Sequence, residues 1–114
     1  MADAYFTAGT ILGEWRIVQL DDCDQATLDL DGEAFIELRP DGHGSFGFIV
    51  VTGDIDYRVE DQNQTPILRF SWAGFDERDP ASGRGWIRQV SADRLDGHVY
   101  YHCGDDAAFT ATRK

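Results

Sequence analysis

Asp54–Glu60, with the sequence DIDYRVE, decides the fold class of this 114-residue chain. Its apolar side chains, Ile55, Tyr57 and Val59, occupy every second position, and charged side chains fill the positions between them. Side chains alternate between the two faces of a β-strand. The pattern therefore predicts a strand with one buried face and one face in water.

Seven more short apolar segments flank this stretch, separated by glycine, proline, asparagine or aspartate. The expected strands cover residues 13–20, 34–39, 46–51, 54–60, 67–72, 86–90, 98–103 and 109–112. No segment carries a convincing 3.6-residue period, and residues 25–28 are expected to be a loop or a short helical turn. The sequence predicts one all-β domain over residues 1–114, an antiparallel up-and-down meander of about eight strands forming a small barrel or curved sheet.

Two connections between the expected strands differ in length. Thr52–Asp54 contains a glycine between two polar residues and is expected to be a tight reversal. Gly74–Gly85 is polar and rich in glycine, and it is expected to be a long loop between Trp72 and Trp86. Long loops on a rigid β scaffold are common binding sites, so this segment is the first place to look for function.

The charge balance of the chain limits the classes of partner. There are 21 acidic and 10 basic residues, for a formal net charge of −11. Phosphate neutralisation needs clustered basic side chains, so the sequence predicts no nucleic-acid partner, and a basic protein partner fits better. No apolar run approaches the length of a membrane span, and Cys23 and Cys103 are expected to be reduced thiols. We therefore expect a cytoplasmic protein without a membrane partner, and a homodimer is an open alternative.

The stretch Gly13-Glu14-Trp15 places a glycine two residues before a tryptophan on the first strand. Together with the eight-strand meander, it resembles the calycin-like barrels of lipocalins and fatty-acid-binding proteins. The resemblance implies a barrel whose closed end is covered by Trp15 and whose interior holds a small apolar ligand. The stretches 70–77 and 82–86 look like fixed motifs of an uncharacterised bacterial family, to which no activity attaches.

The ligand-binding candidates combine aromatic rings with arginines at the base of the expected loop. If the fifth and sixth strands pair, Trp72 and Trp86 come close and form an aromatic wall, with Arg84 or Arg88 as a carboxylate-seeking group. Tyr100 and His102 are added because the alternation of the seventh strand places them on one face with His98. The candidate ligand-binding residues are Trp72, Trp86, Arg84, Arg88, Tyr100 and His102.

Motifs for catalysis, metals and cofactors are missing from the sequence. No nucleophile elbow, phosphate-binding glycine loop or Cys-x-x-Cys pair occurs, and a calcium loop ending at Leu38 fails in register. A Cys103–His102 pair is disfavoured because neighbours on a strand point to opposite faces. No metal site or cofactor is predicted. The weak catalytic candidates are His102, Glu77 and Asp79.

The sequence favours a non-enzymatic binding domain, for a small apolar ligand or for a basic protein partner in the manner of an inhibitor or immunity protein. One alternative is a small barrel enzyme in which His102 acts with Glu77 or Asp79 near an aromatic pocket. A second alternative is a structural subunit of a homo-oligomer. The interior of the barrel distinguishes the two binding modes. Side chains that only line it would leave room for an apolar ligand, whereas side chains that fill it would favour a site on the outer surface.

Overall fold

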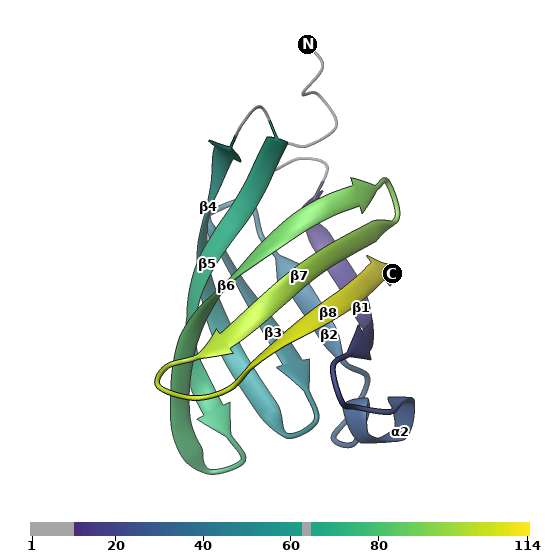
Figure 1. Cartoon of the computed structure of the whole chain (residues 1–114), viewed down its shortest axis with the longest axis vertical. Coiled ribbons are helices and arrows are strands. Elements are labelled where there is room, and N and C mark those ends of the chain that lie inside the picture. Colours follow the sequence, from purple (N-terminus) through teal and green to yellow (C-terminus); the bar gives the residue numbers. More distant parts are fainter. Residues whose placement is uncertain (1–10, 63–64) are drawn as a thin grey trace.

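The fold is a closed barrel of eight antiparallel strands in chain order, seen in a computed structural model that describes residues 11–62 and 65–114 (Figure 1). The strands are β1 (Gly13–Leu20), β2 (Phe35–Leu38), β3 (His43–Phe48), β4 (Val51–Gln62), β5 (Thr65–Asp76), β6 (Asp79–Ser91), β7 (Arg94–Tyr101) and β8 (Asp106–Arg113). Pairing of β8 with β1 joins the two ends of the sheet. The predicted all-β up-and-down meander is confirmed, and it closes.

A single helical turn, α2 (Gln25–Leu28), connects β1 to β2. Asp24 caps it, because its Oδ1 accepts a hydrogen bond of 2.8 Å from the backbone nitrogen of Thr27. Leu28 is buried, and its carbonyl oxygen accepts a hydrogen bond of 2.9 Å from the backbone nitrogen of Ile49. The turn is thereby attached to the end of the barrel between β3 and β4. No helix in residues 11–62 and 65–114 is long and apolar enough to cross a membrane.

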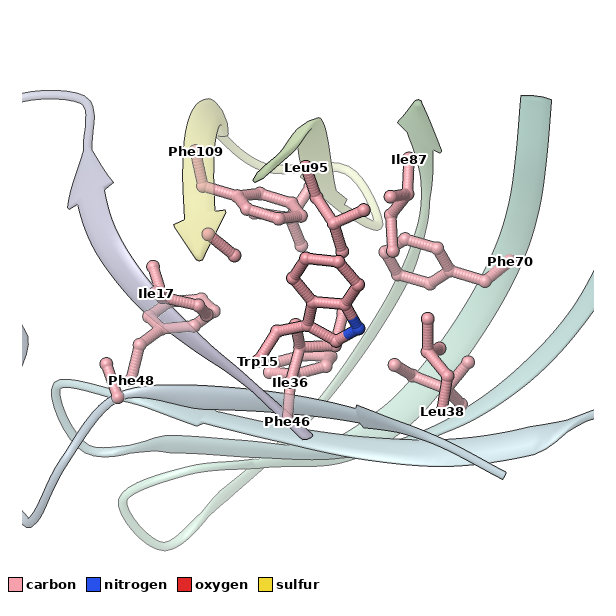
Figure 2. Close-up of a cluster of buried hydrophobic side chains, with 14 of the residues drawn as sticks. Trp15, Ile17, Ile36, Leu38, Phe46, Phe48, Phe70, Ile87, Leu95 and Phe109 are labelled. Atoms are coloured by element: carbon pink, nitrogen blue, oxygen red, sulfur yellow. The ribbon is translucent and has the colours of Figure 1, made fainter. Parts of the chain in front are cut away.

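Apolar side chains from all eight strands fill the inside of the barrel. Figure 2 shows aromatic and aliphatic side chains from facing strands that point toward one another. Among the described residues, the space left between Ile17, Phe46, Phe70 and Phe109 is about 10 Å³. Such a space holds one water molecule at most. The side chains thus nearly fill this part of the described interior.

The first and last strands are joined at Trp15. Its side chain is fully buried, and its indole nitrogen donates a hydrogen bond of 2.9 Å to the carbonyl oxygen of Ile11. The guanidinium carbon of Arg113 lies 3.8 Å from the centre of the Trp15 ring. This contact covers the indole with a cation and connects β8 to β1 beyond their backbone pairing.

The expected reversal at Thr52–Asp54 is wrong. The chain turns earlier, at Ile49 and Val50, and residues 52–54 pair with β5 inside a long β4. Position 53 requires glycine for steric reasons, because a Cβ atom there would lie 2.7 Å from the ring of Phe46. The aromatic ring occupies the volume that a side chain at Gly53 would need.

The expected long loop at Gly74–Gly85 is also wrong. β5 and β6 continue through this segment as a hairpin whose turn is only Glu77 and Arg78, with Asp76 paired to Asp79. The glycines that suggested a loop sit within the strands. At Gly83 a Cβ atom would lie 1.7 Å from a backbone oxygen of β7, so glycine allows the two strands to approach.

Candidate functional site

At one end of the barrel β6 extends further than β7 (Figure 1). A groove lies beside the end of β7. Gly83 pairs with Tyr101, the last residue of β7, whereas β6 continues to Asp79. Beyond Tyr101 the chain turns back toward β8, and the backbone nitrogen of His102 donates a hydrogen bond of 2.7 Å to the carbonyl oxygen of Ser82. The difference in strand length therefore creates a step between the hairpin and the turn.

Two hollows lie at this end of the barrel. The first, named the arginine groove, has a volume of about 690 Å³ and is lined by Ser71, Trp72, Ser82, Gly83, Arg84, Tyr100, Tyr101, His102, Cys103 and Gly104. The second, named the acidic groove, has a volume of about 480 Å³ and is lined by Asp76, Asp79, Pro80, Ala81, Ser82, Tyr101, His102, Gly104 and Asp105. Each is large enough for part of a ligand, and both linings include Ser82, Tyr101, His102 and Gly104.

Three carboxylates surround the acidic groove. Asp76 and Asp79 face each other at the end of the hairpin, and Asp105 comes from the turn before β8. Within the described residues none of the three forms a salt bridge. Burial, with Asp76 and Asp105 nearby, raises the pKa of Tyr101 to about 12. The groove is thus a region of concentrated negative charge beside a half-buried aromatic ring.

The arginine groove has the opposite character. The guanidinium carbon of Arg84 lies 4.6 Å from the centre of the Tyr100 ring. Trp72 forms part of the floor, and its indole nitrogen donates a hydrogen bond of 3.2 Å to the carbonyl oxygen of Tyr100. The ring of Trp72 also packs edge-on against Tyr101, with 5.3 Å between ring centres. A cation and aromatic rings therefore define this end of the groove.

Arg84 belongs to a continuous stack on the outer face of β6 and β7. His98 lies between Tyr100 and Trp86, with ring centres 4.6 Å and 6.3 Å away, and Arg88 covers Trp86 at 5.5 Å. Asp106 on β8 contacts the imidazole of His98 at 2.5 Å. Four of the predicted ligand-binding residues, Arg84, Trp86, Arg88 and Tyr100, are thus brought together. His98 also belongs to this stack but is missing from the predicted ligand-binding residues, although the alternation along β7 places it on the same face as Tyr100.

The expected aromatic wall of Trp72 and Trp86 does not form. Trp72 pairs with Gly83 and is 3% exposed, so it points into the barrel. Trp86 pairs with Arg69 and points outward, onto the stack with His98. The two tryptophans lie on opposite faces because Trp86 is three positions after Gly83, the partner of Trp72, and side chains alternate with a period of two.

The catalytic candidates meet only in part. His102 and Asp79 line the acidic groove, whereas Glu77 occupies the hairpin turn, with a φ of 59° and its nitrogen bonded to the oxygen of Val50. Among the described residues, the imidazole of His102 has no hydrogen bond to a carboxylate. It is exposed, and its neighbour is the thiol of Cys103. The geometry assembles no acid–base pair from His102 with Glu77 or Asp79.

The contact between His102 and Cys103 corrects an expectation from the sequence. The seventh strand ends at Tyr101, so both residues belong to the following turn and the alternation rule does not apply to them. Cys103 adopts a φ of 56°, and its sulfur lies 3.6 Å from Nε2 of His102. Cys23 and Cys103 both carry free thiols.

The carboxylates of the groove lack a metal-binding arrangement. Within residues 11–62 and 65–114, no three side chains of histidine, cysteine, aspartate or glutamate are grouped so that they could hold a metal ion. Asp76, Asp79 and Asp105 instead form an acidic surface.

No protein-family model, curated protein or solved structure matches this chain. The class of the protein therefore rests on its own geometry. It is a small closed up-and-down β-barrel with a filled described interior and a charged groove at one end.

Proposed function

We propose that this protein is a non-enzymatic binding domain for a basic protein partner, in the manner of an inhibitor or immunity protein. The observation that carries the proposal is the acidic groove, in which Asp76, Asp79 and Asp105 surround a half-buried Tyr101. A lysine or arginine side chain of the partner would enter this groove. There it would gain charged partners and an aromatic face.

The charge of the whole chain supports the same partner. A net charge of −11 attracts a basic protein over a distance and raises its rate of association, most strongly at low ionic strength. The acidic groove then gives the encounter a defined position. Long-range attraction and a shaped local site together are typical of charge-steered protein recognition.

The filled interior supports an external site over an internal one. A ligand at the centre of the barrel would have to displace packed rings, because the space lined by Phe46, Phe70 and Phe109 is only about 10 Å³. Opening a larger space would cost the packing energy of several buried side chains. The groove needs no such rearrangement, since it already lies open at the surface.

A binding experiment with a defined cationic probe tests the proposal. The probe is a six-residue peptide with two lysines, and its control carries glutamine in place of both. Substitution of Asp76, Asp79 and Asp105 by asparagine is expected to lower the affinity for the lysine peptide about tenfold or more. The matched control variant changes Asp31, Asp54 and Asp56 to asparagine, and these residues are exposed away from the groove.

The two triple variants remove equal charge, so they separate a site from general attraction. The control variant is expected to retain affinity within about twofold at physiological salt. Equal losses in both variants, or a lysine peptide that binds no better than its glutamine control, would refute the proposed function. Isothermal titration calorimetry gives the affinities, and amide chemical shifts locate the peptide on the protein.

We also propose that the barrel is calycin-like and acts in the cytoplasm. The kinship is supported by the eight-strand meander and by a fully buried Trp15 two residues after Gly13. The location is supported by the free thiols of Cys23 and Cys103, which suit a reducing compartment. Identification of the compartment by fractionation of the source cells tests the second part.

A further inference from the structure

We infer that the linkage between Asp41 and Gly42 is a site of spontaneous backbone modification, at which the nitrogen of Gly42 attacks the carboxyl group of Asp41 and the turn is converted to an isoaspartyl linkage. The only co-reactant is water. The turn joins β2 to β3 and belongs to neither the arginine groove nor the acidic groove, so this inference is independent of the proposed function.

Three aspartates in the chain are followed directly by glycine, at residues 31–32, 41–42 and 96–97. Such linkages are chemically labile because glycine has no Cβ atom. Its nitrogen can therefore approach the preceding carboxyl carbon, and its backbone can adopt the conformations that ring closure needs. The surroundings in the fold determine which of the three linkages reacts.

The linkage between Asp96 and Gly97 is held inside the sheet. Gly97 pairs with Ile87 on one side and with Phe109 on the other. The carboxylate of Asp96 accepts a hydrogen bond of 3.3 Å from the hydroxyl group of Thr110. Strands on both sides prevent the backbone rotation that attack requires, so this linkage is protected.

The linkage between Asp31 and Gly32 lies in the turn after α2. The backbone nitrogen of Gly32 donates a hydrogen bond of 3.2 Å to the carbonyl oxygen of Asp29. The N–H group that must lose its proton is therefore engaged. The side chain of Asp31 is exposed and forms no hydrogen bond with a described residue, so its carboxyl group is not held near that nitrogen.

The linkage between Asp41 and Gly42 has the arrangement that attack needs. The backbone nitrogen of His43 donates a hydrogen bond of 3.1 Å to Oδ1 of Asp41, which folds the carboxyl group back over the peptide bond of Gly42. Gly42 has a φ of 86°, and its own nitrogen forms no hydrogen bond with a described residue. The nucleophile is free, and the carbon that it attacks is held beside it.

The side chain of His43 can supply the proton that the reaction consumes. Its Nδ1 lies 3.5 Å from Oδ1 of Asp41. The Gly42 nitrogen forms a bond to Cγ of Asp41, and one carboxylate oxygen leaves as water. That water carries one proton from the imidazolium of His43 and one from the Gly42 nitrogen, so the imidazole becomes neutral.

A water molecule then opens the five-membered ring and returns a proton to the imidazole of His43. When this water adds to the main-chain carbonyl carbon of Asp41, the bond from that carbon to Gly42 breaks. The chain then continues through Cβ and Cγ, and the turn is longer by one carbon atom. The carbonyl oxygen of Gly42 accepts a hydrogen bond of 2.9 Å from Tyr57, so the longer turn is expected to weaken this attachment and lower the unfolding midpoint.

Incubation of the full chain in heavy-oxygen water near neutral pH tests the inference. Each cycle of ring closure and opening places one solvent oxygen in the aspartyl residue. Mass spectrometry of peptides, after digestion in ordinary water, compares the three linkages within one sample. Asp41 is expected to gain heavy oxygen about threefold or more faster than Asp31, and Asp96 is expected to gain none.

Short peptides that span each linkage show what the fold contributes. In these peptides the three aspartates are expected to react within about threefold of one another, because no folded structure orients them. Asp41 is expected to react faster in the folded chain than in its peptide.

His43→Gln tests the proton donor and keeps the backbone hydrogen bond to Asp41. It is expected to slow the reaction at Asp41 about fivefold and to leave Asp31 unchanged. The matched control is Arg39→Gln, which removes a cation from the same turn without removing an imidazole. This control is expected to leave the rate at Asp41 within about twofold. Amide spectra of both variants verify that the barrel is folded.

Two results would overturn the inference that the fold promotes reaction at this turn. One is a rate at Asp41 no higher than the rate at Asp31 in the folded chain. The other is a rate at Asp41 no higher in the folded chain than in its peptide. If His43→Gln and Arg39→Gln slow Asp41 equally, the loss of positive charge explains the effect and the proton transfer from His43 is wrong.

Discussion

The ring of Phe70 lies directly over Gly85 on the neighbouring strand, so that a Cβ atom at Gly85 would sit 2.4 Å from Cζ of Phe70. A second obstacle is close by, because the same Cβ would lie 2.5 Å from the carbonyl oxygen of His98. The glycine thus provides room for an aromatic ring from one strand and for the backbone of another. The core of this barrel depends on such pairings as much as on its apolar side chains.

Alanine at these glycines should destabilise the barrel to an extent that depends on what blocks the new methyl group. At Gly53 the nearest atoms belong to the rings of Phe46 and Trp72. Gly53→Ala is expected to cost about 1–3 kcal/mol of unfolding free energy, and Phe46→Leu in the same chain should recover part of that loss. Denaturant unfolding followed by tryptophan fluorescence measures each value.

Gly85→Ala serves as the contrasting case. The backbone oxygen of His98 remains in place when Phe70 is shortened, so Phe70→Leu is expected to give no comparable recovery. Equal recovery at both glycines would show that ring size alone determines the cost. The backbone of β7 would then add no obstacle of its own.

These glycines also explain where sequence and structure diverge. The alternation in 54–60 predicts β4 correctly, because a half-buried strand exposes its period directly. Gly53 and the glycines of 74–85 instead suggest turns, since glycine is the residue of tight turns as well as of close approach. Which of the two applies depends on a ring from another strand, and that ring is distant in the sequence.

The candidate site is predictable to a similar degree. Arg84, Trp86, Arg88 and Tyr100 can be selected as an aromatic and cationic set, and the structure stacks them on one face. The groove itself cannot be foreseen. It arises because β6 is longer than β7, and strand ends are poorly determined by local pattern.

Acidification should show how much the carboxylate of Asp29, at the end of α2, contributes to stability. A hydrogen bond from the backbone of Ala34, assisted by the side chains of Gln25 and Arg16, lowers the pKa of Asp29 below its usual 3.8. A lowered folded pKa stabilises the protein above the unfolded value, and this contribution is lost as the pH falls through the folded pKa. Asp29→Asn should therefore be less stable than wild type near neutral pH.

The difference between Asp29→Asn and wild type should shrink as the pH falls below about 4, where wild type loses the same charge. Unfolding midpoints at neutral and acidic pH measure it. Asp31→Asn is the control, because Asp31 is an exposed neighbour without these hydrogen bonds. If the difference in stability between Asp29→Asn and wild type stays constant down to acidic pH, the charge of Asp29 contributes nothing to stability.

Alkaline conditions should act on the acidic groove through Tyr101. Burial and the carboxylates of Asp76 and Asp105 raise its pKa to about 12. A raised folded pKa means that the neutral phenol is favoured, so the contribution to stability is present below the unfolded value of 10.0 and is lost as the pH rises through the folded pKa. Tyr101→Phe should flatten the alkaline loss of stability, as unfolding midpoints would show.

The ultraviolet absorbance of phenolate tests the same assignment without unfolding the protein. The difference between wild type and Tyr101→Phe isolates the titration of Tyr101, which should lie above that of an ordinary tyrosine. Asparagine at Asp76 and Asp105 should move it only part of the way back, because burial is the larger cause. A titration at the ordinary value would contradict the crowding of negative charge around this ring.

The two free cysteines should differ in reactivity toward alkylating reagents. Cys23 is half-buried, and burial together with the nearby Asp24 and Asp29 raises the pKa of its thiol, which suppresses the reactive thiolate. Cys103 is exposed, with its sulfur 3.6 Å from Nε2 of His102, an imidazole that can accept its proton. Cys103 should therefore react with iodoacetamide about tenfold faster than Cys23 near neutral pH.

Mass spectrometry of Cys23→Ser and Cys103→Ser resolves the two rates. In Cys23→Ser, the added change His102→Gln should slow alkylation of Cys103, because it removes the proton acceptor and leaves the turn exposed. The arginine groove offers a further measurement, since His102 and Cys103 line it. A peptide seated there should shield Cys103 and leave Cys23 unaffected. Alkylation of Cys103 that is indifferent both to His102 and to bound peptide would show that the turn stands apart from the groove.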